Sequence, residues 1–262
     1  MLSPDQTVFL IYHELERPGR ATCRRDPGYL RYVVSEANFR AHLDRLRAQG
    51  FQGLSVGAAL ADPPTGQRAV AITFDDGCET DLLIAARLLQ ERGFGATFYV
   101  VAGFVGRPGF LTGVQVRELA ELGFEIGCHS MTHPYLTDLD DRQLRVEVVE
   151  AKDRLEQLTG RPVGHFSCPG GRWDERVACL ARESGYVSVA TSRVGANTSV
   201  TDRFCLARVA VQQGTSLSDF DGACRGRHFW RRRLKDRVLA SAKRLAGNTL
   251  YEKVRTVVLG YG

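Results

Sequence analysis

The feature that most constrains the fold is a regular alternation of short apolar runs with longer amphipathic segments. The apolar runs predict strands at 7–12, 69–74, 95–101, 124–130, 163–167, 186–191 and 208–213. Segments with apolar residues at helical spacing predict helices between them, at 35–50, 79–93, 112–123, 138–158, 174–185 and 217–224. Strands that alternate with helices pair in parallel through crossover connections, so we expect an α/β fold.

Chemically distinctive residues follow these predicted strands directly. Asp75 and Asp76 follow one strand, His129 another, and the stretch SCPGG at 167–171 a third. In a β/α barrel, the carboxyl ends of the strands form the rim that carries the chemistry. An open sheet also binds ligands at strand ends, but the repeated pattern favours a (β/α) barrel.

Charge divides the chain into two expected parts. From Arg225 to the end, eleven Lys or Arg against two acidic residues give +9, which leaves −4 of the net +5 for the remainder. We expect a barrel at 1–222 and a basic amphipathic helical tail at 223–262. The tail either contacts an anionic membrane surface or packs on the barrel. The acidic body and the lack of a recognition motif argue against a nucleic-acid partner.

The location is expected to be cytoplasmic, with a membrane-peripheral alternative through the tail. The seven cysteines are scattered and odd in number, which is typical of reduced thiols. The sequence contains no CxxC pair, so it does not indicate a thiolate zinc site. The first residues lack a basic leader and carry only a short apolar run. No window reaches the roughly 18 apolar residues of a membrane span.

Two stretches together predict a metal site. AVAITFDDG at 69–77 ends a strand in two carboxylates, and GCHSMTHP at 127–134 places His129 and His133 four residues apart. Imidazole and carboxylate ligands suit Zn²⁺ or another divalent first-row ion, and three protein ligands leave a position for water. One aspartate can bind the ion while its neighbour handles protons. Alone, DDG is a turn signal and HxxxH is two unrelated histidines.

Three stretches resemble, in order and spacing, the motifs of the polysaccharide deacetylase (NodB-homology) family, carbohydrate esterase family 4. They are TFDDG at 73–77, HSMTHP at 129–134 and the degenerate FSCPGG at 166–171, and the resemblance spans residues 6–215. It implies a distorted (β/α)7 barrel and metal-dependent hydrolysis of acetyl groups on N-acetylated sugars. By position it implies that Asp75 is the catalytic base and that the metal ligands are Asp76, His129 and His133.

The chain departs from the family pattern at three points. Ser167 occupies the place of an arginine that usually holds the catalytic aspartate, so we expect Arg208 or Arg172 to supply that cation. Gly170 replaces a bulky aromatic, which predicts a wider groove. The late Leu-x-His motif that often supplies the general acid is absent. His13, in a Tyr-His segment resembling that of one branch of the family, is assigned this role; the alternative is a core histidine.

Other residues near the motifs have expected roles. A backbone N–H of the loop formed by Pro169, Gly170 and Gly171 is expected to hold the oxyanion. Trp173 either stacks on a sugar ring or packs. Cys128 points away from its neighbour His129 on an extended strand and fills the core. His42 is placed on the polar side of its helix and has no function.

The sequence thus predicts a metal-dependent carbohydrate de-N-acetylase. The expected substrate is an N-acetylated sugar, glycoside, nucleotide sugar or lipid-linked glycan. The alternatives are a catalytically impaired glycan-binding protein on the same fold, and a de-O-acetylase or amidase on a non-polymeric substrate. An aspartyl phosphatase would need an alternating Asp-x-Asp after the strand, which FDDG lacks.

Overall fold

The computed structural model describes residues 6–61, 67–227 and 229. Its strands are β1 (Val8–Tyr12), β2 (Leu15–Glu16), β3 (Val34–Ser35), β4 (Phe51–Leu54), β5 (Arg68–Phe74), β6 (Thr97–Val100), β7 (Glu125–Cys128), β8 (His165–Ser167), β9 (Ser188–Ala190) and β10 (Val209–Ala210). Its α-helices are α1 (Pro27–Leu30), α2 (Glu36–Ala48), α3 (Val56–Ala61), α4 (Arg87–Gln90), α5 (Gly113–Glu121), α6 (Asp141–Arg145), α7 (Ala151–Thr159), α8 (Glu175–Glu183) and α9 (Leu217–Cys224).

Two π-helical segments and several 3₁₀ turns complete the described part of the chain. The π-helical segment Asp81–Ala86 runs directly into α4, and Val146–Glu150 joins α6 to α7. The 3₁₀ turns are Ala102–Phe104, Leu136–Asp138, Pro169–Gly171 and Arg203–Cys205.

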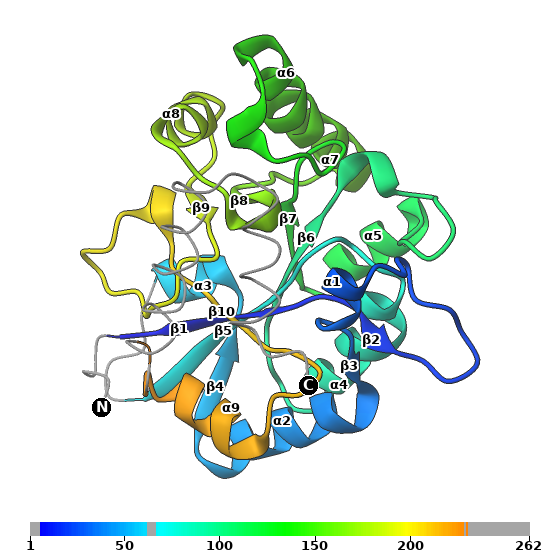
Figure 1. Ribbon diagram of the computed structural model, residues 1–262, viewed down its shortest axis with the longest axis vertical. Coiled ribbons are helices and arrows are strands. Elements are labelled where there is room, and N and C mark those ends of the chain that lie inside the picture. Colours follow the sequence, from blue (N-terminus) through cyan, green and yellow to red (C-terminus); the bar gives the residue numbers. More distant parts are fainter. Residues whose placement is uncertain (1–5, 62–66, 228, 230–262) are drawn as a thin grey trace.

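The main sheet is parallel and follows the order β10-β1-β5-β6-β7-β8-β9. β4 also pairs with β5, along its first residues, and β2 and β3 form a separate small sheet. In Figure 1 the strands lie at the centre and the helices α2, α4, α5, α7 and α8 surround them. Parallel pairing follows because a helix connects successive strands on the outer side.

One short segment joins the two ends of this sheet. Leu206 bridges to Ala190 of β9, and a few residues later Val209 and Ala210 pair with β1. The sheet therefore curls until its first and last strands meet through residues 206–210. This arrangement confirms the distorted (β/α)7 barrel that the sequence predicts.

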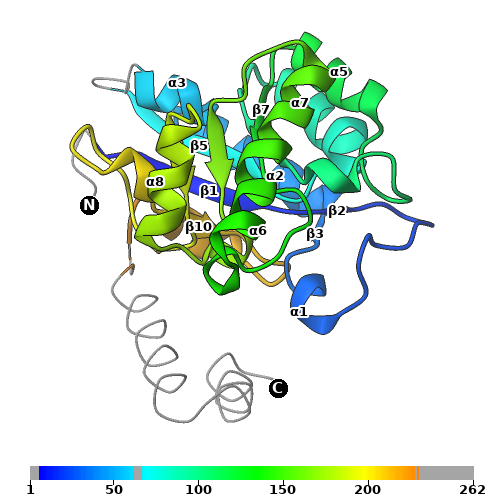
Figure 2. The ribbon, with the colours of Figure 1, turned by 90° about the horizontal axis from the view of Figure 1, so that it is seen from above.

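The barrel has an inner and an outer apolar layer because strand side chains alternate in direction. The inner layer is small and is closed at one end by two residues of α3; its members are Phe9, Ala71, Tyr99, Ala190, Leu206, Val56 and Ala59. The outer layer lies between strands and helices and includes Leu10, Ile72, Phe74, Phe98 and Val100. Figure 2 shows α3 and α1 on opposite sides of the molecule.

Local capping explains where several helices begin and end. Ser35 caps α2, while Thr112 and Asp140 form capping boxes with glutamines three residues on. The predicted helix at 138–158 begins after Asp140, passes through the π-helical segment and ends at Gly160, whose φ is 66°. A glycine tolerates this left-handed conformation without a Cβ clash.

The expected boundary between 222 and 223 falls within α9, and almost all of the basic tail lies outside the described residues. The division into barrel and tail therefore stays a prediction. Within the described ranges, no helix combines the length and apolar character that crossing a bilayer requires.

Candidate metal and catalytic site

The alternation of side chains along the strands brings the candidate residues to one rim of the barrel. On β5, Ala71 belongs to the inner layer, so Asp75, four residues later, continues on the same side. Three other candidates lie at the carboxyl ends of strands: His13 follows β1, His129 follows β7 and Ser167 ends β8. Arg208 instead precedes β10 and reaches the rim through its long side chain. Cys128 is fully buried in the outer layer, on the opposite side from His129.

Asp76, His129 and His133 meet at a single point. Asp76 Oδ1 lies 3.5 Å from His129 Nε2 and 3.3 Å from His133 Nε2. The ligand atoms of all three residues lie within 4.8 Å of one another. Asp76 and His133 both have positive φ, 82° and 66°, which is uncommon outside glycine. Such strained backbone persists where surrounding contacts enforce it, as at functional sites.

The hydrogen bonds around this cluster fit a bound cation. His129 Nδ1 donates to the Ser167 carbonyl at 2.8 Å, so Nε2 carries the lone pair that faces Asp76. Asp76 Oδ1 is buried and accepts no hydrogen bond. A buried carboxylate oxygen without a donor is unfavourable unless an ion compensates it. The two nitrogens and one carboxylate oxygen are therefore a donor set suited to a divalent metal.

Charge and burial act in opposite directions on these groups. Burial lowers the pKa of His129 to about 4, so its imidazole is neutral and able to act as a ligand. Burial alone would raise the pKa of Asp76, but the imidazoles of His133 and His13 bring it below its usual range. The cluster thus presents an ionised carboxylate to the lone pair of His129 and to the imidazole of His133.

A second group of ligand-type residues, Glu14, Cys23 and Cys78, lies in the same part of the fold. The atoms that could bind a metal there already form hydrogen bonds within the protein. The Glu14 carboxylate accepts from the Cys23 backbone N–H at 2.9 Å and the Tyr29 hydroxyl at 3.0 Å. Cys23 Sγ donates to the Gly109 carbonyl at 2.9 Å. This group fits a hydrogen-bonded anchor for the loop after β2.

Asp75 is held by a buried arginine. Arg208 Nη1 donates to Asp75 Oδ1 at 2.8 Å and Arg208 Nη2 to Asp75 Oδ2 at 2.9 Å, a two-pronged contact. The Ser167 hydroxyl receives from Arg208 at 2.7 Å and donates to Asp75 at 3.3 Å. Burial would raise the pKa of Asp75, but the guanidinium lowers it below its ordinary value. Asp75 is therefore ionised.

Of the two arginines that the sequence offers, Arg208 contacts Asp75 and Arg172 does not. Arg172 lies over the Tyr135 ring at 3.6 Å and donates to Asp138 at 3.2 Å. It is directed to the exposed side of the Pro-Gly loop rather than to the acid pair. The positive charge beside Asp75 thus comes from Arg208, in the segment that closes the barrel.

His13 lies on the same rim, next to the acid pair. Its ring lies against that of Tyr32, tilted by 31° with centroids 4.7 Å apart, and its Nδ1 is buried without a hydrogen-bond partner. Burial lowers the pKa of His13, while the nearby Asp76 and Asp75 act to raise it. The unpartnered nitrogen departs from the expected alternative of a core histidine hydrogen-bonded to backbone.

The Pro-Gly loop forms a 3₁₀ turn over Pro169–Gly171 in which both glycines have positive φ. The Gly171 N–H donates to the Cys168 carbonyl at 2.8 Å, so it is used within the loop. Trp173 donates through Nε1 to the Phe204 carbonyl at 2.7 Å, and the Arg193 guanidinium lies over its ring at 4.7 Å. One face of this indole is therefore covered by a cation.

Sequence reasoning missed several residues that support the site. Ser130 Oγ accepts the His133 N–H at 2.9 Å, and Thr73 Oγ1 accepts from Arg208 at 3.1 Å. Glu147 binds the loop between the two histidines. Ser130 and Thr73 lie inside the motifs and were within reach of the sequence, whereas Glu147 has no local signal.

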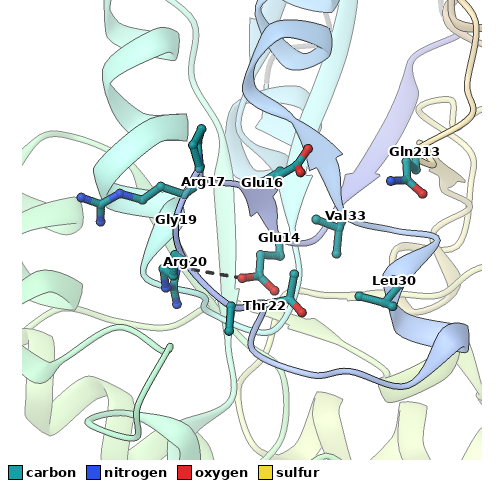
Figure 3. Close-up of a pocket in the computed structure, with 11 residues that line it drawn as sticks. Glu14, Glu16, Arg17, Gly19, Arg20, Thr22, Leu30, Val33 and Gln213 are labelled. Atoms are coloured by element: carbon teal, nitrogen blue, oxygen red, sulfur yellow. Dashed lines mark ion pairs between the residues drawn. The ribbon is translucent and has the colours of Figure 1, made fainter.

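A pocket of about 310 Å³ opens beside this rim (Figure 3). It is lined mainly by the loop after β2, with Glu14 and Arg20 facing each other at 3.9 Å. Leu30, Val33 and Gln213 form its other side. The residues of the metal cluster do not line it, so the cluster and this pocket are separate features of the described part of the chain.

Comparisons with known proteins identify the family of the chain. Residues 62–189 match the family Polysaccharide deacetylase. YxkH of Bacillus subtilis (strain 168) is 29% identical over 191 residues, 71% of this chain and 68% of YxkH. The peptidoglycan-N-acetylglucosamine deacetylase of Bacillus cereus is 32% identical over 127 residues, 48% of this chain and 57% of that protein.

The solved structure of the Streptococcus pyogenes deacetylase PplD in complex with acetate has a TM-score of 0.73 at 21% identity. It covers 85% of this chain and 99% of that chain. This likeness supports the fold. The span 62–189 contains Asp75, Asp76, His129, His133 and Ser167. On the matched span and the alignment with YxkH, the chain belongs to the polysaccharide deacetylase family.

Proposed function

We propose that this chain is a metal-dependent hydrolase that removes the acetyl group from an N-acetylated sugar. One observation carries the proposal: a buried, unpartnered Asp76 oxygen faces two imidazole nitrogens beside an aspartate that Arg208 keeps ionised. Such clustering of ligand-type and perturbed groups is typical of active sites.

Asp76, His129 and His133 would hold the ion, with Zn²⁺ the first candidate among divalent metals. When bound, a divalent ion supplies Lewis-acid polarisation of the acetyl carbonyl and lowers the pKa of the attacking water. The hydrogen bond from His129 to the Ser167 carbonyl fixes the tautomer that leaves Nε2 free for this role.

Asp75 serves as the general base. It lies 3.9 Å from His129 Nε2 through Oδ2, close to the ligand atoms, and it stays ionised because Arg208 balances its charge. The same ion pair makes it a weak base, so it accepts a proton only from an acidified water. Arg208 also fixes the direction of the carboxylate, which keeps its free lone pairs toward the site.

His13 donates the proton that the leaving nitrogen requires, because an amine leaves poorly without one. Burial favours neutral His13, so His13 would take up a proton from solvent before it donates one to the leaving nitrogen. In the Pro169–Gly171 loop, Gly171 uses its N–H for Cys168, which leaves the Gly170 N–H as the proposed oxyanion donor. Trp173, which Arg193 covers on one face, packs at the edge of this loop.

The substrate is proposed to be a sugar with an acetamido group. The Bacillus cereus relative is named for N-acetylglucosamine in peptidoglycan. A cytoplasmic location would favour a nucleotide sugar or lipid-linked glycan, with the basic tail at 223–262 as the membrane contact. The impaired-binder alternative rested on Ser167 in place of an arginine and on the missing late histidine. Arg208 beside Asp75 answers the first point and supports an active enzyme.

The test is acetate release from an N-acetylglucosamine oligosaccharide by zinc-loaded protein. We expect release that a chelator abolishes and that Asp75→Asn lowers at least 100-fold, in the range of about 10²–10⁴ for general-base catalysis. His165→Gln is the matched control, because His165 is a buried histidine bonded to Ser188 away from the rim. An O-acetylated sugar in parallel separates de-O-acetylation. Release that survives both chelator and Asp75→Asn contradicts the proposal.

A further inference from the structure

The loop that carries both proposed imidazole ligands has an unfavourable backbone conformation. Ser130 and His133 have φ of 70° and 66°, in the left-handed region that non-glycine residues rarely adopt. The segment also makes a tight turn, closed by the His133 N–H to Ser130 Oγ. A conformation of this kind persists only when neighbouring groups hold it.

A single carboxylate outside the motifs holds this loop from behind. Glu147 Oε2 accepts the backbone N–H groups of Met131 at 2.9 Å and Thr132 at 2.8 Å. Glu147 Oε1 accepts the Thr132 hydroxyl at 2.5 Å. Glu147 is only 6% exposed, so its carboxylate is largely removed from solvent and would be costly to leave without these partners.

The helix that carries Glu147 is rigid and changes locally from α-helical to π-helical geometry at this point. Glu147 lies in the π-helical segment Val146–Glu150, where one turn holds an extra residue and shifts the direction of the side chains. The neighbouring Leu144, Val148 and Ala151 are buried in the core and fix the helix against the barrel. The carboxylate is therefore presented by a rigid element rather than by a loop.

We infer that Glu147 is a positioning residue that sets the metal affinity of the site by holding the 129–134 loop in its ligating conformation. The inference rests on the proposed function, because it assumes that His129 and His133 bind the ion. Glu147 is not one of the three clustered ligand residues; it acts through the Met131 and Thr132 N–H groups, which lie between the two histidines in sequence. Outer residues that orient metal ligands typically change metal affinity by about 10–100-fold when removed.

The bonding pattern gives a test that separates positioning from charge. In Glu147→Gln the amide oxygen can replace Oε2 and accept both N–H groups, while the amide nitrogen donates to the Thr132 hydroxyl oxygen. In Glu147→Ala all three bonds are lost. We expect Glu147→Gln to bind Zn²⁺ close to the parent affinity and Glu147→Ala to bind it about 10–100-fold more weakly.

Glu125→Ala is the matched control. Glu125 also accepts a backbone N–H, from Gly57 at 3.0 Å, and a threonine hydroxyl, from Thr97 at 2.5 Å, but it lies at the start of β7, the opposite end from the rim. It should lose stability like Glu147→Ala while its Zn²⁺ affinity stays at the parent value. Thr132→Val, which removes only the hydroxyl bond of an exposed residue, provides a second variant that keeps the fold.

The measurement is Zn²⁺ titration of the metal-free proteins by calorimetry, with Co²⁺ absorption spectra to report the ligand geometry. Weaker binding and an altered Co²⁺ spectrum in Glu147→Ala, a smaller change in Thr132→Val and recovery in Glu147→Gln support the inference. Parent affinity in both Glu147→Ala and Thr132→Val overturns it and leaves the proposed function intact. A parent protein that binds no better than His129→Ala overturns both.

Discussion

The buried ion pair between Arg208 and Asp75 gives the sharpest quantitative prediction. Arg208 is 1% exposed, and its guanidinium donates to Asp75, Ser167, Thr73 and the Thr191 carbonyl. Arg208→Met keeps an unbranched stem but ends before the guanidinium, so it leaves the Asp75 carboxylate buried and without its cation. The variant tests whether the pair is as tightly coupled as its geometry indicates.

The expected loss of unfolding free energy is large because the remaining Asp75 carboxylate is buried and cannot be hydrated. Breaking a buried pair by removing one partner costs about 3–5 kcal/mol, against about 0–1 kcal/mol for an exposed pair. Globular proteins are stable by only about 5–15 kcal/mol, so Arg208→Met loses a sizeable share of the total. Adding Asp75→Asn removes the stranded charge, so the double variant should be more stable than Arg208→Met alone.

The assay is urea unfolding of the parent, both single variants and the double variant, followed by far-UV circular dichroism. A double-mutant cycle extracts the coupling free energy, which we expect at about 3 kcal/mol or more. Arg208→Lys keeps the charge but not the two-pronged contact, so it should fall between the parent and Arg208→Met. Equal stability of Arg208→Met and the double variant, with coupling below about 1 kcal/mol, would refute the reasoning.

Two further predictions concern stability. Burial lowers the pKa of His42 to about 4, below the 6.5 of an unfolded histidine, so protonation favours the unfolded chain. His42 stabilisation is present above pH 6.5 and falls by up to about 3 kcal/mol toward pH 4; His42→Gln should flatten that slope in urea midpoints, and parallel slopes would contradict it. Gly171→Ala places a Cβ 2.2 Å from Ser192 Oγ, whereas Gly93→Ala, with similar φ, meets open space. In the same assay, Gly93→Ala should lower the free energy of unfolding by about 1–2 kcal/mol, and Gly171→Ala should lower it by about 1–3 kcal/mol more than Gly93→Ala does. Equal losses in the two variants would argue against the close contact.

The sequence predicts the barrel well because local patterns encode it. Apolar runs and helix caps are read over a few residues, and the rim follows from which residues come after each strand. β4 was not predicted, because Phe51–Leu54 is short and contains Gly53, which weakens a strand pattern. Gly53 is present because a Cβ there would lie 2.7 Å from Phe94 Cγ, a contact that only the fold reveals.

The placement of His42 on the polar side of its helix was wrong. Phe39, His42, Leu43 and Leu46 of α2 are all buried, at the spacing of a single helical face. His42 bonds the Tyr12 hydroxyl at 3.2 Å and stacks on Phe220 at 4.2 Å. Its position three residues after Phe39 indicates the buried face of the helix. The polarity of the histidine side chain led to the opposite assignment.

The partner of Asp75 shows why the rest of the site escaped prediction. Arg172 and Arg208 were equal candidates by sequence, and only the tertiary structure separates them, because Arg208 and Asp75 are 133 positions apart in the chain. Glu147 is likewise invisible by pattern, since two of its three partners are backbone N–H groups of a loop 15 and 16 residues away. Hydrogen bonds to backbone place no demand on the identity of the residues that donate.

The route by which Arg208 reaches Asp75 links catalysis to closure of the barrel. The guanidinium contacts the end of β5 through Thr73, the end of β8 through Ser167 and the residue after β9 through the Thr191 carbonyl. Arg208 itself belongs to residues 206–210, the segment that joins β9 to β1. An arginine on β8 would hold Asp75 from one strand, whereas Arg208 holds it only when the barrel is closed. Serine at 167 is then the small residue that leaves room for this guanidinium and bonds both partners, so a large side chain at 167 would displace the cation and the base together.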